Sequence, residues 1–365
     1  MGAHARLDAR ARWIRDLAEG HETQAVPGLG DYRVLLPDQG DRLVLRVAER
    51  LAPGPGHTLE IALGAQAWAN TSEKDRERSP IDEARSREHT LRSIEVISTS
   101  FADGPITPTV GVRVQSEAFS QSLTRTIVTP SERRDERTAE VAPTALHQAA
   151  AYAQARLRPI PELTVLPGVR AEAHSRFPGA VAPRLAAAYA PTDDVALRAS
   201  VGRGYRAPSA KEYGFVFDHS FYGYRVEGSS TLDPESSWGV SGDVTLHPVR
   251  GLRIQVAGFA NWVSDLIDLR FDRRDETGTD VYAYRNVGAA RTYGASVLGA
   301  YRVSPRFRAE VGYAWLGTRD DERERPLPGR PPHVVTVGGV ATLPLEVELS
   351  TRYRVHARAF LDDRT

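Results

Sequence analysis

VALRASVGRGYRAPSAKEYGFVF, residues 195–217, decides the fold of this chain. At its start Val195, Leu197 and Val201 occupy every second position, with arginine and serine between them. A period of two is typical of a β-strand with one apolar and one polar face. The glycines and the proline that follow allow the chain to turn, and alternation resumes in SSWGVSGDVTL, residues 236–246. Two strands are therefore joined by roughly thirty residues, whereas a hairpin connection usually has two to five.

The same rhythm continues along the chain, and the connections between the alternating segments come in two lengths. Short turns such as PTDD and VRG alternate with long connections, namely the one after Arg203, residues 272–280 and residues 317–332. Barrels of the outer membrane have short turns at one rim and long loops at the other, whereas a sandwich with Greek-key crossings has less reason to sort its connections. The sequence therefore predicts an all-β fold, a transmembrane antiparallel up-and-down β-barrel.

Residues 252–262 illustrate the two faces that such a strand needs. One face is predicted to meet lipid and the other a wet lumen. The lipid face holds Leu252, Ile254, Val256 and Trp262, and the lumen face holds Arg253, Gln255 and Asn261.

The rest of the chain gives weaker patterns. Residues 5–18 fit a short helix or an ill-ordered arm, so we expect residues 1–30 to form an N-terminal arm and residues 31–365 the barrel portion. The stretches 71–88 and 130–140 are rich in charges and chain breakers, which predicts loops.

Composition excludes several classes of protein. The sequence contains no run of 18 apolar residues, so it predicts no membrane-spanning helix. Lys+Arg and Asp+Glu are balanced at 47 each, so no basic face for nucleic acid is expected. Cysteine is absent, which excludes disulfides and thiolate metal sites.

Several ordered motifs resemble the TonB-dependent outer-membrane receptors, from about residue 150 onward. They are APRLAAAYAPTDDVALRAS (182–200), GRGYRAPSAKE (202–212), GSSTLDPESS (228–237), NWVSDLIDLRF (261–271), AYRNVGAARTYGASV (283–297) and LPGRPPH (327–333). The resemblance implies a portion of a barrel of about 22 strands. It also implies structural roles for the motif residues Arg203, Gly204, Tyr205, Arg206, Pro208, Ser209, Glu212, Pro234, Glu235, Asn286 and Gly294.

Aromatic residues crowd the longest connection, and exposed aromatics often mark binding surfaces. The expected ligand contacts are Tyr213, Phe217, Tyr222, Tyr224 and Arg225. Packing of the connection upon itself is the alternative for any one of these side chains. No catalytic motif and no histidine pair at ligand spacing is visible, so we expect no enzyme activity, no cofactor and no protein-bound metal.

The resemblance implies a receptor in the bacterial outer membrane that takes up a scarce nutrient, such as a ferric siderophore, haem or cobalamin. Its partners would be outer-membrane lipid and the TonB complex, the latter through a plug domain that this sequence does not contain. No secretory signal, TonB box or terminal aromatic strand is recognised, so the sequence is expected to be a barrel fragment lacking its C-terminal strands.

Two alternatives remain open from the sequence. A passive outer-membrane porin would close its strand ladder at sixteen or eighteen strands, whereas a piece of a receptor would leave the ladder open. A soluble all-β binding module is the second alternative.

Overall fold

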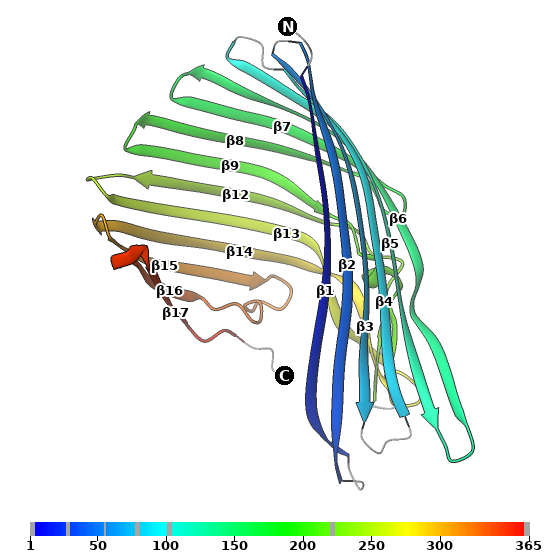
Figure 1. Ribbon diagram of the computed structural model, residues 1–365. Helices are drawn as coiled ribbons and strands as arrows, with labels where there is room; N and C mark the ends of the chain where they lie inside the picture. Colours follow the sequence, from blue (N-terminus) through cyan, green and yellow to red (C-terminus); the bar gives the residue numbers. More distant parts are fainter. Residues whose placement is uncertain are drawn as a thin grey trace.

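The computed structural model describes residues 4–26, 30–54, 56–76, 81–100, 104–219 and 223–360, and these form one curved sheet (Figure 1). Fifteen strands build this sheet, which we call the wall. Each strand of the wall pairs antiparallel with the next one along the chain, and after β9 the next strand of the wall is β12. They are β1 (His4–Val26), β2 (Gly30–Gly54), β3 (His57–Arg76), β4 (Ile81–Ser100), β5 (Ile106–Val128), β6 (Arg133–Ile160), β7 (Leu163–His174), β8 (Ala180–Thr192), β9 (Val195–Arg206), β12 (Glu235–Leu246), β13 (Leu252–Arg274), β14 (Asp280–Ser304), β15 (Phe307–Asp320), β16 (His333–Thr342) and β17 (Glu348–His356). The all-β, up-and-down prediction is confirmed.

Among the described residues, three short elements lie between β9 and β12, and one lies before β17. They are α1 (Ala210–Gly214), β10 (Val216–His219), β11 (Tyr224–Glu227) and the 3-10 turn η2 (Pro344–Glu346).

The strand ladder is open. Among the described strands no pairing joins β1 to β17, and the two strands form separate edges of the sheet (Figure 1). An open ladder is the result expected for a receptor portion and not for a closed porin.

The two rims of the wall differ, as the sequence predicted, but less regularly. At the short-turn rim, the fully described connections, among them residues 161–162, 193–194 and 247–251, are all tight. The opposite rim, which we call the long-loop rim, carries long connections at residues 207–234 and 321–332. The long connection expected at residues 272–280 was wrong, because β13 continues to Arg274 and β14 starts at Asp280. Residues 129–132 and 275–279 of this rim make only tight turns.

The prediction of loops at 71–88 and 130–140 was wrong for residues 71–76, 81–88 and 133–140, which lie in strands, while residues 77–80 are outside the described residues. Strands β3 and β4 are paired as far as Lys74 and Glu83, and β5 and β6 are paired as far as Val128 and Arg133. These hairpins extend the wall beyond the level at which the shorter strands end (Figure 1). Polar side chains occupy both faces of these extensions, so the alternation of apolar and polar residues that marks a strand disappears.

The expectation of a helix or an ill-ordered arm at 5–18 was also wrong. These residues lie in β1, paired with β2 from His4 to Val26. The period of two is present, since Leu7, Trp13 and Leu17 share one face and are 63–69% exposed. The charged residues between them obscured it.

Along each strand of the wall, alternate side chains lie on the outer and the inner face, as predicted. On the outer face of β13, Val256 and Trp262 are 48% and 47% exposed, while Leu252 and Ile254 are partly exposed and none is sealed inside protein. On the inner, concave face the Gln255 Nε2 donates to Asp243 Oδ1 at 3.4 Å, and Arg198 donates to the same oxygen at 3.1 Å. Apolar side chains thus face outward and polar side chains bond to one another inside. No helix within the described ranges is long and apolar enough to cross a membrane.

Candidate functional site

The long connection at 207–234, which we call the inner segment, folds onto the concave face of the wall. Its strand β11 pairs in parallel with the start of β14, from Tyr224 opposite Asp280 to Glu227 opposite Ala283. Its other side reaches β6, where Phe215 forms a β-bridge with Val141. The inner segment therefore connects β6 to β14, two strands that are not neighbours in the wall.

Two apolar clusters hold the inner segment in place. Phe215 and Val226 pack with Val141 of β6, and Ala210 packs with Leu146 and Phe177. Further rings of the wall, including Phe119, Tyr282 and Tyr284, lie against these clusters. The only apolar cores among the described residues thus lie between the inner segment and the wall.

Helix α1 starts the inner segment with a capping box. Pro208 is buried, and Ser209 then caps the helix: its Oγ accepts from the Glu212 amide at 3.2 Å. In return, the Ser209 amide donates to Glu212 Oε2 at 2.7 Å. Reciprocal bonding of this kind satisfies two amides that a helix start leaves unpaired.

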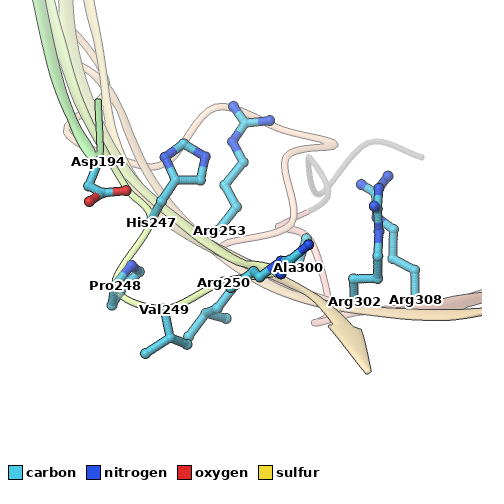
Figure 2. Close-up of a pocket in the computed structure, with 11 residues that line it drawn as sticks. Asp194, His247, Pro248, Val249, Arg250, Arg253, Ala300, Arg302 and Arg308 are labelled. Carbon is cyan, nitrogen blue, oxygen red and sulfur yellow. The ribbon is translucent and has the colours of Figure 1, made fainter. Parts of the chain in front are cut away.

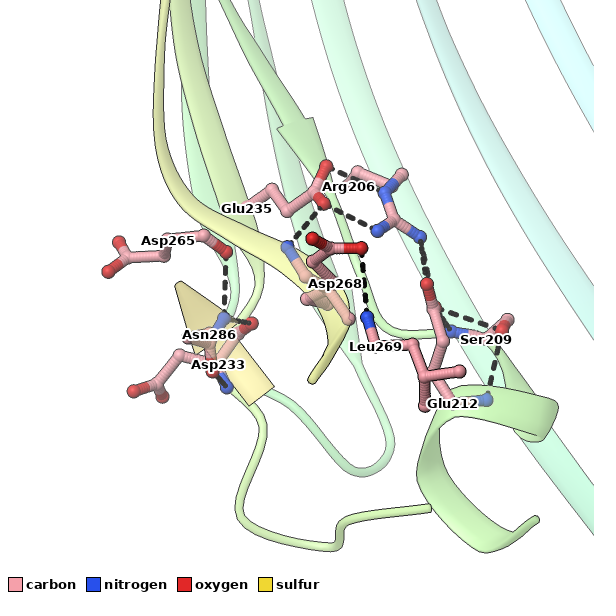
Figure 3. A network of polar contacts seen from close by, with 10 residues as sticks. Arg206, Ser209, Glu212, Asp233, Glu235, Asp265, Asp268, Leu269 and Asn286 are labelled. Carbon is pink, nitrogen blue, oxygen red and sulfur yellow. Dashed lines mark hydrogen bonds and ion pairs between the residues drawn. The ribbon is translucent and has the colours of Figure 1, made fainter. Parts of the chain in front are cut away.

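Arg206, Glu212 and Glu235 form a polar anchor at the base of the inner segment (Figure 3). The Arg206 Nε donates to Glu235 Oε2 at 2.7 Å and its Nη2 to Oε1 at 2.5 Å, a bidentate pair. The remaining nitrogen, Nη1, donates to both Glu212 oxygens at 3.0 and 3.1 Å. Glu235 Oε1 also accepts from the Ile267 amide at 2.8 Å, so β9, α1, β12 and β13 meet at one guanidinium.

Asn286 makes a second junction beside this anchor (Figure 3). Its Nδ2 donates to the carbonyls of Asp233 and Asp265 at 2.8 and 2.7 Å, and its Oδ1 accepts from the Asp233 amide at 2.8 Å. Asp265 has a positive φ of 58°, a conformation that an L-residue rarely adopts. The amide of Asn286 therefore joins the end of the inner segment to an irregular point of β13.

Burial raises the pKa of the Glu212 carboxyl, but hydrogen bonds from Arg206 and Ser209 outweigh burial, so its net pKa lies below the usual 4.5. Since the folded pKa is the lower one, the ionised carboxylate stabilises the fold above pH 4.5, and this contribution is lost as the pH falls through the folded pKa. We expect the free energy of unfolding to fall more steeply below pH 4.5 for the natural chain than for Glu212→Gln, measured by urea unfolding in micelles. Parallel pH profiles would contradict this assignment.

The other motif residues have packing roles or none. Tyr205 Oη donates to the Pro178 carbonyl at 2.7 Å, and Pro234 is half-buried just before β12. A Cβ at Gly204 would lie 2.5 Å from the Ser237 hydroxyl, and one at Gly294 would lie 2.7 Å from the Trp315 carbonyl. Arg203 is exposed, and its side chain makes no hydrogen bond or ion pair within the described part of the chain.

The expected ligand contacts lie mainly within the packed inner segment. Tyr213 accepts a hydrogen bond from Arg176 at 3.3 Å, and its ring packs on Phe177. Phe217 and Tyr224 pack against the first apolar cluster, and Arg225 pairs with Glu227 at 2.8 Å. Tyr222 lies outside the described residues.

Sequence reasoning missed a buried polar group in the hairpin extensions. Glu140 is 2% exposed, and its two oxygens accept from Arg85 Nε at 3.1 Å and Gln121 Nε2 at 2.7 Å. The guanidinium of Arg85 also lies 4.8 Å from the centre of the Phe217 ring. Arg85 and Glu140 occur in stretches that were predicted to be loops, and only the spacing of Glu83, Arg85 and Arg87 at every second position indicated a strand.

No group of three or more metal-ligating side chains occurs among the described residues.

A family model, described as TonB dependent receptor-like, beta-barrel, matches residues 67–364. The chain belongs to the TonB-dependent receptors.

Solved structures of TonB-dependent receptors share the fold at low identity. A mutant of the ferric enterobactin receptor PfeA from Pseudomonas aeruginosa matches with a TM-score of 0.56 and 11% identity, over 98% of this chain and 68% of that one. The copper transporter OprC matches with a TM-score of 0.63 and 13% identity, over 97% and 67%. The siderophore receptor PirA from Pseudomonas aeruginosa matches with a TM-score of 0.54 and 13% identity, over 97% and 69%.

No curated protein matches this receptor chain. Its family and its structural neighbours are named as receptors and transporters, and the family implies the bacterial outer membrane.

Proposed function

We propose that this chain is the barrel portion of an outer-membrane transporter that captures a metal chelate, such as a ferric siderophore, from outside the cell. Uptake would be driven by the TonB complex through a plug domain. The chain would perform no covalent chemistry, because its task is to bind the chelate and release it inward.

The observation that carries this proposal is the inner segment, which places aromatic and cationic groups on the concave face near the long-loop rim. The Arg176 guanidinium lies 5.3 Å from the centre of the Tyr213 ring, and Arg225 lies on β11 beside Tyr224. A chelate presents an organic shell around its metal and often carries a net negative charge. Aromatic faces bind the shell, and guanidiniums bind the charge.

The names of the structural neighbours support the same class of ligand. Two of them are receptors for a ferric siderophore or for siderophores, and one is a copper transporter. The share of identical residues is too low to carry a particular ligand over to this chain, so the proposal is limited to metal chelates.

Binding is tested with the chain in detergent micelles, by quenching of tryptophan fluorescence with a panel of ferric siderophores and copper complexes. We expect at least one chelate to bind, and we expect Arg225→Gln to weaken that binding about tenfold, equivalent to about 1.4 kcal/mol. Tyr189→Ala is the control, because Tyr189 lies on the outer face of β8 and is 42% exposed.

If no chelate binds while the chain conducts simple salts across a planar bilayer, the passive-porin alternative replaces this proposal. Equal weakening by both variants would remove Arg225 from the binding site.

A further inference from the structure

A cavity of about 740 Å³ lies at the short-turn rim, at the end of the strands away from the inner segment. The turn at 247–251 and the adjoining ends of β13, β14 and β15 form it, and His247, Arg253, Arg302 and Arg308 line it (Figure 2). Arg250 of the turn and Asp194, its one acidic residue, complete the charged lining.

The arginines of this cavity are poorly neutralised. Arg302 and Arg308 lie directly opposite each other on β14 and β15, a position in which like charges destabilise a sheet. Arg308 has Glu310 at 3.7 Å, but Glu310 also accepts a hydrogen bond from Arg352 at 2.9 Å. For Arg302, no side-chain partner is found within the described residues, and Arg253 bonds only to the neutral Gln255, at 3.3 Å.

A buried hydroxyl nearby also lacks a partner. Thr245 is 5% exposed, and its Oγ1 makes no hydrogen bond to the described part of the chain. It lies opposite Gln255 on the same face of the sheet, two residues along β13 from Arg253. An unpaired buried hydroxyl costs about 1–3 kcal/mol.

These side chains face the concave side and not the lipid. Arg253 lies on the same face of β13 as Gln255, which is the concave face. Arg302 and Arg308 lie on that face of β14 and β15, together with Leu298 and Glu310. Val256 and Tyr301, at the alternate positions, are exposed on the outer face. Figure 2 shows Arg253, Arg302 and Arg308 extending to the same side of the sheet. A lipid headgroup, which would approach from the outer face, is therefore a poor match.

We propose that this cavity binds an acidic polypeptide segment that enters from the short-turn rim. Neighbouring strands are about 4.8 Å apart, and diagonal positions are about 7–8 Å apart, so Arg253, Arg302 and Arg308 present separated charges. Carboxylates at alternate positions of an extended chain repeat every 6.6–6.8 Å or so, close to the diagonal separation of Arg253 and Arg302, while Arg308 lies directly opposite Arg302 and adds charge at the same point. The cavity volume lies in the range of about 300–1,000 Å³ typical of organic ligands, well above the need of one small anion.

This inference does not depend on the identity of the transported chelate, because it concerns the opposite rim. A chain that binds no chelate could still bind the acidic segment, and the reverse also holds.

The test uses the natural chain in neutral detergent and a fluorescein-labelled peptide of alternating Glu and Ser, with a Gln-Ser peptide as the matched probe. We expect anisotropy to report binding of the Glu-Ser peptide only, and we expect added salt to weaken it. The double variant Arg302→Gln, Arg308→Gln should bind about tenfold more weakly. Arg158→Gln is the control, since Arg158 is exposed at the same rim but outside the cavity.

A second measurement separates binding from folding. If Arg302 and Arg308 serve a partner, removing their mutual repulsion leaves the unfolding midpoint of the double variant unchanged or raised. A lowered midpoint, equal binding of both peptides, or competition by inorganic phosphate or anionic vesicles in place of the peptide would each overturn the proposal.

Discussion

Val256→Arg should lower the free energy of unfolding of this chain in a bilayer by about 2–4 kcal/mol. Val256 lies on the outer face of β13, 48% exposed, a few residues above the turn at 247–251 and so near the middle of the span. A guanidinium there would meet hydrocarbon with no acidic side chain to pair with it. Urea unfolding in lipid vesicles, followed by tryptophan fluorescence, measures the difference.

The neighbouring position provides the control. Gln255→Arg places the same charge at the same depth but on the concave face, where Asp243 Oδ1 already accepts a hydrogen bond from Gln255. We expect this variant to change stability by only about 0–1 kcal/mol. Equal losses for both variants would contradict the assignment of the outer face to lipid.

Arg206→Ala should detach the inner segment from the wall. The side chains of Glu212 and Glu235 are only 15% and 12% exposed, and without the guanidinium they would lose the donor that joins them. Because Arg206 itself is 45% exposed, the expected loss is about 1–3 kcal/mol, less than for a fully buried pair. Limited proteolysis within residues 207–234 should become faster, which gel analysis after brief trypsin treatment would detect.

Arg203→Ala serves as the matched variant for this experiment. Arg203 is exposed three residues earlier on β9, so its removal should change stability by no more than about 0.5 kcal/mol. If both variants are cleaved at the natural rate, the polar anchor does not hold the segment.

The sequence predicted the wall where one face of a strand is apolar and the other is not crowded with charges. At Val256 and Gln255, alternation alone assigned each side chain to its face, because lipid and water demand opposite chemistries at neighbouring positions. It failed for the hairpin extensions around Glu83 and Arg87, where both faces are polar, and for β1, where charges obscured the period. Local patterns carry no signal when the environment on the two faces is the same.

The polar anchor was predicted in part and the inner segment was not. The resemblance singled out Arg206, Glu212 and Glu235, and the structure joins all three through one guanidinium. The parallel pairing of β11 with β14 could not be predicted, because it joins residues more than fifty positions apart over only four residue pairs. Likewise, the cavity at Arg302 and Arg308 depends on the register between two strands, which spacing alone does not fix.

The links made by the inner segment have a mechanical consequence. Hydrogen-bonded backbone runs from β6 through the wall to β14, on to β11 and β10, and back to β6 through Phe215 and Val141. This circuit is a complete ring, although the ladder as a whole is open. The curvature of strands β6 to β14 is thus braced from within, and their amides should exchange with deuterium more slowly than those of β1 and β17, whose outer edges have no such brace.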